Sequence, residues 1–453
     1  MRLQRQGGIV YVILKDMSRI SVGSKSENNN STIQAGRTIR ILVLLTGGTI
    51  GSRICDSVIN VDADSSYLLI HMYDEWRKNR YITLVTDSEL KDSESTNLRT
   101  ADSESTDIES MYPQIEFVVH NPINILSENL QPSDWEVLYR EIKEALINYD
   151  GIIITHGSDT LSYTAAFVGF SFSNANIPIV LTAANYPLED ERSVGLRNFI
   201  AAVEYISGAA LDISGATLDI GGAALDIGGA TLGEETEVPK ADDTTSNIRL
   251  YNIPCVIYEN DLGVMEVFEA TKLRPADSYR DQFSSFDGRP LGTMVDGKFK
   301  PIVQTKKEYT KNIDKISDKI TDKISDGTLD ETSVNVFCYD NTDFAFTNQI
   351  GLLTPYPGFR YDTVMLSEEM KAILINAYHS GTVCTEGEGT NINCLLSRCE
   401  SRGIDVYICS FKDVSAAQYA SVAGLLGESV IGLENISPEA AYVKLLLEYN
   451  QNK

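Results

Sequence analysis

The chain has 453 residues, 43% of them hydrophobic, and a formal net charge of −26. This length accommodates two or more domains with a sizeable core. The negative charge argues against a nucleic-acid-binding surface, which requires a basic patch. No stretch approaches the run of about 18 apolar residues that a membrane span needs, and the short apolar run near the N-terminus does not fit a secretory signal. We therefore expect no nucleic-acid partner, no membrane contact and a cytoplasmic location.

Seven cysteines are scattered along the chain, an odd number that does not suit a disulfide framework. Cys384, Cys394 and Cys399 lie near His379 in the sequence, but their spacing fits no zinc pattern. We therefore expect buried thiols and no metal site.

Three segments are internally repetitive. Residues 87–112 contain Asp-Ser-Glu-Ser-Thr twice, residues 207–245 begin with seven-residue units such as SGAALDI, and residues 305–333 repeat Asp-Lys-Ile-Ser with a Thr variant. The first two segments carry net charges of −6 and −7. Paired glycines make the heptads a poor helix, because each Gly costs about 1 kcal/mol relative to Ala, so we interpret them as an expanded surface loop. The third segment fits a short charged helix or a solvated linker.

Strands alternate with helices once these segments and an N-terminal extension, residues 1–38, are set aside. In a larger domain, residues 39–304, we predict strands at 40–45, 115–120, 151–155, 177–181, 253–258 and 264–268, and helices at 133–148, 160–172 and 193–205. After the linker, a smaller domain, residues 334–453, has predicted strands at 336–339, 351–354, 372–377 and 405–409 and a final helix at 438–449. This order predicts an α/β fold class: a larger N-terminal domain with a mainly parallel sheet flanked by helices, plus a smaller C-terminal α/β domain.

Two loops that directly follow buried strands carry most of the functional signal. Residues 46–50 read TGGTI, and residues 155–160 read THGSDT. The carboxyl ends of parallel strands meet at one edge of a sheet, so the two loops can converge on one site. Thr49 follows two glycines, which suits a nucleophilic hydroxyl beside bare backbone N–H groups. Its alternative role is to satisfy a tight turn.

Ser158 and Asp159 precede a helix predicted to begin at Thr160. Their ordinary role would be to cap that helix. Their functional role would be to place a hydroxyl and a carboxylate at the positive helix end, facing whatever Thr49 faces. Together with a lysine, the carboxylate could form a proton relay that activates the hydroxyl.

TGGTI followed by THGSDT resembles the bacterial-type L-asparaginase family (asparaginase/glutaminase), which includes amidase subunits of tRNA-dependent amidotransferases. The resemblance runs from about residue 39 to the C-terminus, interrupted by the repeats. It implies that Ser127, in NILSEN, binds the substrate α-carboxylate beside Glu128. It also implies that Lys272, in Ala-Thr-Lys, is the catalytic lysine, and that Ala184, in LTAAN, lies near the substrate amide.

The activity implied by the resemblance is that of an L-asparagine amidohydrolase. Thr49 would attack the side-chain amide, ammonia would leave from an acyl-enzyme, and water would release aspartate, with Ser158, Asp159 and Lys272 as the relay. No cofactor is implied. L-Glutamine is a second expected substrate, because one methylene discriminates by only about 1–3 kcal/mol. The family is typically a homodimer or homotetramer, which we expect here.

The sequence departs from the family at two places. Ser158 stands where the family usually has Thr, and residues 50–66 contain no tyrosine where family members carry a lid tyrosine. Asp56 and Ser57 are the polar residues nearest that position; Tyr67, another tyrosine or a different lid could serve instead. Two other functions stay open: the amidase subunit of a tRNA-dependent amidotransferase, for whose extra N-terminal domain residues 1–38 are too short, and a catalytically weak amino-acid-binding homologue.

Overall fold

The computed structural model describes residues 2–6, 9–13, 38–62, 67–79, 113–213, 250–302, 346–411, 418–427 and 430–451. Several predicted features lie outside these residues: the acidic segment 87–112, the linker 305–333, the strand at 336–339 and all of segment 207–245 beyond its first seven residues.

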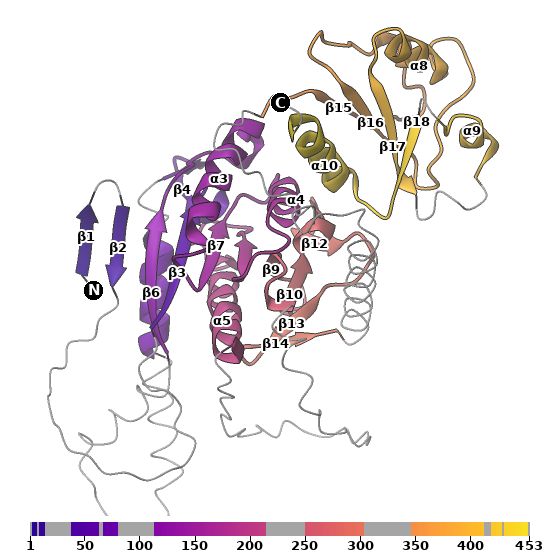
Figure 1. The fold of residues 1–453 in the computed structure, drawn as a ribbon. Helices are drawn as coiled ribbons and strands as arrows, with labels where there is room; N and C mark the ends of the chain where they lie inside the picture. The colour runs from indigo at the N-terminus through magenta and orange to yellow at the C-terminus, as the bar shows by residue number, and fades with distance from the viewer. Residues whose placement is uncertain are drawn as a thin grey trace, which may run out of the picture.

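A ten-stranded sheet is formed by the described residues of the larger unit, in the order β1-β2-β6-β3-β7-β8-β9-β10-β13-β14 (Figure 1). Its central strands are parallel: β6 (Gln114–His120), β3 (Thr38–Leu45), β7 (Gly151–Thr155), β8 (Ile179–Thr182) and β9 (Cys255–Glu259). Antiparallel strands extend both sides: β1 (Arg2–Gln6), β2 (Ile9–Ile13), β10 (Met265–Glu269), β13 (Gly292–Val295) and β14 (Lys298–Pro301). Every strand predicted for this unit is confirmed to within two residues.

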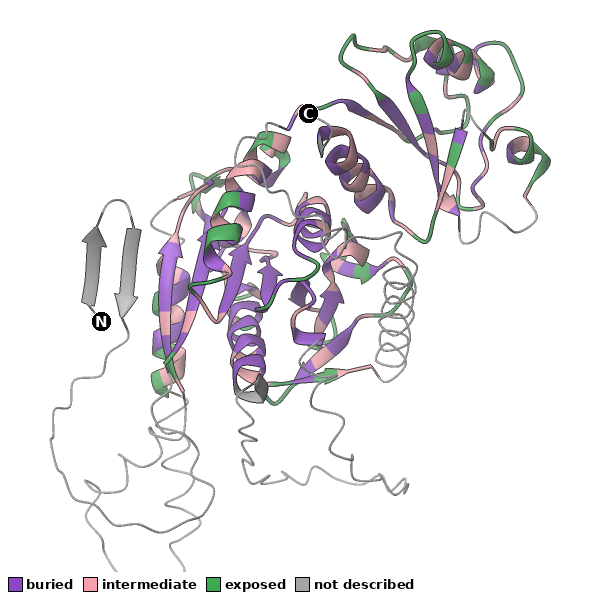
Figure 2. Cartoon of the chain, viewed as in Figure 1, coloured by how far each residue is buried: buried purple, intermediate pink, exposed green. Residues whose placement is uncertain are grey.

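Helices cover both faces of the sheet, because its parallel strands are apolar on both sides. Along β3, Leu42 packs into one core cluster and Val43 into the other, as expected for side chains that alternate between the faces of a strand. The first cluster is completed by α3 (Pro132–Ala145) and α4 (Leu161–Ser171), and the second by α5 (Gly195–Ile213) and the helical residues 67–79. Figure 2 shows the central strands buried between these helices.

A four-stranded parallel sheet forms the smaller unit: β15 (Ile350–Leu353), β16 (Ala372–Asn376), β17 (Asp405–Phe411) and β18 (Val430–Glu434). The last helix, α10 (Pro438–Gln451), packs between this sheet and α4 (Figure 1). The Tyr163 ring of α4 and the Tyr442 ring of α10 meet edge to face, with centroids 6.0 Å apart. The predicted fold class is therefore confirmed, with antiparallel strands added at the sides of the larger sheet.

The helix predicted at 193–205 extends further, because α5 runs to Ile213 and includes the first heptad of the acidic repeat. That heptad, SGAALDI, is rich in alanine and has a single glycine, Gly208, so it supports a helix. The interpretation of the heptads as a loop is therefore wrong for this first unit.

Several hairpins and helices were not predicted. The hairpins are β4 (Ser52–Cys55) with β5 (Val58–Val61), β11 (Leu273–Asp277) with β12 (Gln282–Ser285), and β13 with β14. The helices are the one at residues 67–79, α8 (Asn393–Glu400) and α9 (Ala420–Ala423). Among the described helices, none has the length and apolar character to cross a membrane.

Candidate active site

Three loops meet at the carboxyl ends of β3, β6 and β7. The Gly48 N–H, after β3, donates a hydrogen bond to the Ile125 carbonyl, after β6, at 2.9 Å. The Thr160 hydroxyl, after β7, donates to the Ser127 carbonyl, after β6, at 2.9 Å. The convergence predicted from the two motifs therefore occurs, with the loop after β6 bonded to both.

Glycines allow these loops to approach backbone to backbone. Gly48 has a φ of +69°, and a Cβ atom added to it would lie 2.3 Å from the Gly157 Cα. A Cβ atom added to Gly157 would lie 2.4 Å from the Ser127 Oγ. These separations are far below van der Waals contact, so only glycine fits at either position.

Thr49 begins a 3-10 helix, η1 (Thr49–Gly51), and is partly exposed. No hydrogen bond to its hydroxyl occurs among the described residues, so Thr49 does not bond the backbone of the turn through its side chain. That role falls to Ser52, whose Oγ donates to the Gly48 carbonyl at 2.7 Å. The expectation of bare N–H groups is wrong for Gly48, because its N–H is bonded to Ile125.

Ser158 and Asp159 do not cap α4. Thr160 is the N-cap residue, and no side chain makes a capping hydrogen bond there. The exposed Asp159 carboxylate instead accepts a long hydrogen bond, 3.4 Å, from the hydroxyl of the buried Ser127. A carboxylate and a hydroxyl from two different loops thus meet beside the half-buried Ser158.

The other two predicted substrate contacts differ in their exposure. Glu128 is exposed on the short helix η2 (Ser127–Asn129), so its carboxylate is free to face a ligand. Ala184 is fully buried in a core cluster, so its methyl group faces the core and only its backbone groups could meet a substrate.

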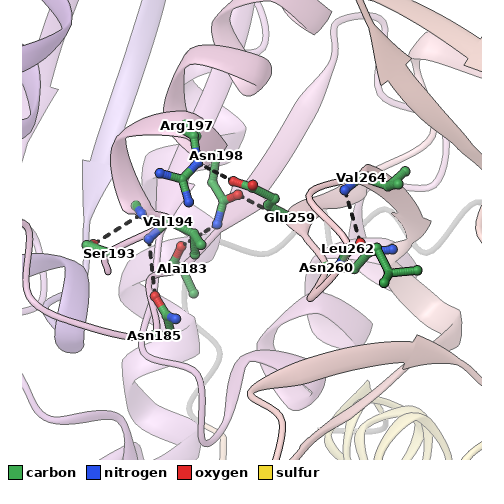
Figure 3. Close-up of polar contacts among 11 residues, drawn as sticks. Ala183, Asn185, Ser193, Val194, Arg197, Asn198, Glu259, Asn260, Leu262 and Val264 are labelled. Carbon is green, nitrogen blue, oxygen red and sulfur yellow. Dashed lines mark hydrogen bonds and ion pairs between the residues drawn. The ribbon is translucent and has the colours of Figure 1, made fainter. Parts of the chain in front are cut away.

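A buried amide that sequence reasoning missed holds the loop after β8 (Figure 3). Asn198, on α5, is fully buried; its Nδ2 donates to the Ala183 carbonyl at 2.9 Å, and its Oδ1 accepts from the Glu259 N–H at 2.9 Å. Arg197 also pairs with the Glu259 carboxylate. The residue before Ala184 is therefore tied to the end of β9. The available signal was a polar amide within the apolar run of a predicted helix.

The same loop is closed by its own side chains and reaches the β4–β5 hairpin. The Asn185 Oδ1 accepts hydrogen bonds from the N–H groups of Tyr186 and Val194 at 3.0 and 3.1 Å. On the hairpin, Arg53 lies 3.4 Å from the carboxylate of Asp62 and 3.5 Å from that of Glu189. The Arg53–Glu189 ion pair thus connects the segment after Thr49 to the loop after β8.

The hairpin occupies the position where a lid tyrosine was expected. Asp56 and Ser57 have φ values of 51° and 65° and form its two-residue turn, as in a type I′ turn. Tyr67 lies on the helix 67–79, half-buried and packed against a core cluster. Its side chain therefore contributes to the core on this face of the sheet.

Lys272 lies toward the opposite ends of the parallel strands. Because β10 is antiparallel to β9, Glu269 pairs with Cys255 at the amino end of β9, and the Ala270 N–H donates to the Pro254 carbonyl at 2.9 Å. The short helix η3 (Ala270–Lys272) therefore lies near the amino end of β9, whereas Asp159 follows the carboxyl end of β7.

Two carboxylates hold the Lys272 ammonium: Glu269 at 3.1 Å and Asp287 at 3.3 Å. Among the described residues, no ion pair joins Lys272 to Asp159, so the structure does not assemble the predicted relay. Burial alone would lower the pKa of Lys272, but the Glu269 and Asp287 carboxylates outweigh it and raise that pKa. The side chain is therefore a cation, unable to accept a proton.

No group of three or more His, Cys, Asp and Glu side chains that could hold a metal occurs within the described part of the chain. Among the cysteines considered as ligands, Cys399 is buried as expected, whereas Cys384 is exposed and Cys394 partly exposed, so the expectation of buried thiols is wrong for those two.

Comparison with known proteins places these features in a family. The model of the asparaginase N-terminal domain matches residues 40–306. A glutamyl-tRNA(Gln) amidotransferase subunit of Methanosphaera stadtmanae is 27% identical over 71% of this chain, and the match spans 60% of that protein's length. An L-asparaginase of Thermococcus kodakarensis is 41% identical over 18% of this chain and 25% of its own length. A solved thermostable L-asparaginase from T. kodakarensis has the same fold, with a TM-score of 0.53 at 17% identity, covering 91% of this chain and 93% of its own.

Proposed function

The chain belongs to the asparaginase family, and from this premise we propose that it hydrolyses the side-chain amide of L-asparagine or L-glutamine with Thr49 as the nucleophile. The observation that carries the proposal is the contact of Gly48 with Gly157, which joins the loop of Thr49 to the loop of Ser158 and Asp159. A threonine at a strand end, whose hydroxyl makes no hydrogen bond among the described residues and whose loop touches the loop that carries Asp159, suits nucleophilic catalysis.

In the proposed reaction, the Thr49 Oγ1 bonds to the amide carbon and its proton passes to the amide nitrogen. The C–N bond then breaks, ammonia leaves, and an ester remains on Thr49. Water hydrolyses that ester, which regenerates the hydroxyl and releases the amino-acid carboxylate. We assign Ser127 and Glu128 to the substrate's α-carboxylate and α-amino ends, and Ser158 with Asp159 to proton transfer.

The participation of Lys272 rests on the family resemblance alone. Its ammonium is paired with Glu269 and Asp287, and its raised pKa makes it a source of positive charge and not a base. Entry into the relay would require Lys272 to exchange those partners for Asp159.

The long alignments favour one setting for this chemistry. The similarity to the amidotransferase subunit of M. stadtmanae covers 71% of the chain, whereas that to an L-asparaginase covers 18%. This supports an amidase subunit that supplies ammonia to a partner, in preference to a free-standing L-asparaginase. With a net charge of −26 on this chain, any tRNA contact would come from a basic partner surface. As a free-standing enzyme, the chain would act in a homodimer or homotetramer.

Ammonia release tests the proposal. The purified chain should release ammonia from L-asparagine or L-glutamine, and Thr49→Ala should lower the rate by about a thousandfold or more with an unchanged thermal unfolding midpoint. Activity retained in Thr49→Ala would contradict the assignment. Co-purification of a partner that raises glutamine turnover would support the amidotransferase setting, and full activity on free asparagine without one would support the hydrolase.

A further inference from the structure

His156 is a buried titratable residue that the proposed chemistry does not use. It follows β7 directly and precedes Gly157 and Ser158, and its backbone N–H donates to the Thr182 carbonyl at the end of β8 at 2.8 Å. Its side chain is buried and bonds Thr164 on α4, and among the described residues it has no hydrogen bond to a substrate-facing group that we assign.

Three side-chain hydrogen bonds run in series through this residue. The Trp135 Nε1–H, on α3, donates to the Thr164 Oγ1, on α4, at 3.0 Å. The Thr164 Oγ1 lies 2.9 Å from the His156 Nε2, and the His156 Nδ1 lies 2.8 Å from the Gly157 carbonyl oxygen. Each of these groups is buried or part of the buried backbone.

The chemistry of the two ends fixes the proton on Nδ1, and the burial of the ring determines whether Nε2 also carries one. An indole N–H can only donate and a carbonyl oxygen can only accept, so the His156 Nδ1 must carry a proton to bond Gly157. Burial lowers the pKa of His156 to about 4, so the ring is neutral at neutral pH and Nε2 has no proton. The Thr164 hydroxyl therefore donates to Nε2 and accepts from Trp135.

We propose that His156 is a positioning residue, which in its neutral Nδ1–H tautomer holds the Gly157 carbonyl and so sets the loop of Ser158 and Asp159 against the loop of Thr49. The connection is direct, because Gly157 is the residue on which Gly48 packs. The expected effect of His156 on turnover rests on the proposed function. The hydrogen-bond series is independent of that function.

The histidine side-chain nitrogen spectrum tests the series without any assay of activity. The chain has four histidines, and the signals absent from His156→Asn identify those of His156. We expect a protonated Nδ1 and an unprotonated Nε2, with no titration across the neutral range. A protonated Nε2, or a titration at the ordinary histidine pKa, would overturn the series.

Two buried hydroxyls on α4 provide a matched pair of variants for the positioning role. Thr164→Val removes the hydroxyl between Trp135 and His156, whereas Ser162→Ala removes a buried hydroxyl that has no hydrogen-bond partner among the described residues. We expect kcat to fall about tenfold or more in Thr164→Val, and to change by about twofold or less in Ser162→Ala. Equal kcat values for the two variants would overturn the positioning role.

Further variants separate positioning from folding. Trp135→Phe keeps an aromatic ring, smaller than the indole that stacks on Phe167 at a centroid distance of 5.3 Å, and removes the N–H, so it serves if Thr164→Val does not fold. His156→Asn retains a donor near the Nδ1 position, and we expect it to keep more of kcat than His156→Ala. Equal losses in Asn and Ala would contradict the role of Nδ1. A wild-type chain without amidohydrolase activity would overturn the proposed function, whereas the tautomer would still be decided by the spectrum.

Discussion

A Cβ atom on Gly48 would lie 2.3 Å from the Cα of Gly157, so the loops of Thr49 and Ser158 touch through bare backbone. This contact joins segments that follow two neighbouring strands, β3 and β7. It places the proposed site at the carboxyl edge of the parallel strands, where ligands bind in other open α/β sheets.

Gly48→Ala tests that contact. We expect the free energy of unfolding to fall by about 2–4 kcal/mol, because the φ of +69° strains an alanine and the added methyl overlaps Gly157. Gly358→Ala is the control: Gly358 has a φ of +88° but nothing within 4 Å of an added Cβ, so it reports the backbone strain alone. Urea denaturation of both variants measures the difference. Equal losses of unfolding free energy in the two variants would show that the contact between the two loops does not contribute to stability.

Asn198→Asp tests the hold on the loop after β8. A carboxylate still accepts from the Glu259 N–H but cannot donate to the Ala183 carbonyl, so we expect a loss of about 1–3 kcal/mol in unfolding free energy. Arg197→Ala, which removes the neighbouring exposed ion pair, should cost about 1 kcal/mol or less. A smaller loss in Asn198→Asp than in Arg197→Ala would contradict this account.

The sequence predicted the central strands because each is a continuous apolar run with turn residues at its end. Gly151–Thr155 matches to the residue. Lys298–Pro301 was missed because it alternates polar and apolar residues and depends on its neighbouring strand for its conformation. The strands β1 and β2 were missed because residues 1–38 were interpreted as an extension outside the sheet.

Residues of the site that directly follow parallel strands could be placed from the sequence. Residues whose position depends on the direction of a later strand, or on a long-range contact, could not. The motifs brought Thr49, Ser127 and Asp159 to one edge because parallel strands share that edge. Lys272 lies at the amino ends of the parallel strands because the turn after Asn260 makes β10 run antiparallel to β9. No motif near Lys272 predicts that turn. Asn198 was missed because a single amide in a helix has no partner visible in the sequence.

Lys272→Met distinguishes two roles for Lys272: the structural ion pair with Glu269 and Asp287, and the place in the proton relay that the family resemblance implies. The ion pairs predict a loss of stability, because Glu269 and Asp287 would lose their counter-charge. They also predict a smaller loss of kcat than in Asp159→Asn. Steady-state ammonia release from both variants, at matched folded fractions, measures this. A loss in Lys272→Met as large as that in Asp159→Asn would place Lys272 in the relay.

Acid should destabilise the protein through His156. Its pKa is about 4 in the folded chain and 6.5 ordinarily, so the unfolded chain binds more protons between these values. Stability from this residue is complete above pH 6.5 and falls as the pH is lowered toward 4, by up to about 3 kcal/mol. Urea denaturation of wild type and His156→Gln across this range isolates the contribution of His156 to the free energy of unfolding. Parallel curves for the two proteins would contradict a neutral buried ring.

Detection of the acyl-enzyme tests the central claim most directly. The chain is mixed with L-asparagine or L-glutamine, quenched in acid within the first turnovers, and digested for peptide mass spectrometry. We predict an aspartyl or glutamyl ester on Thr49, absent from Thr49→Ala. An ester on Ser158 or Ser127, or steady ammonia release with no adduct on Thr49 in wild type and full activity in Thr49→Ala, would contradict Thr49 as the nucleophile.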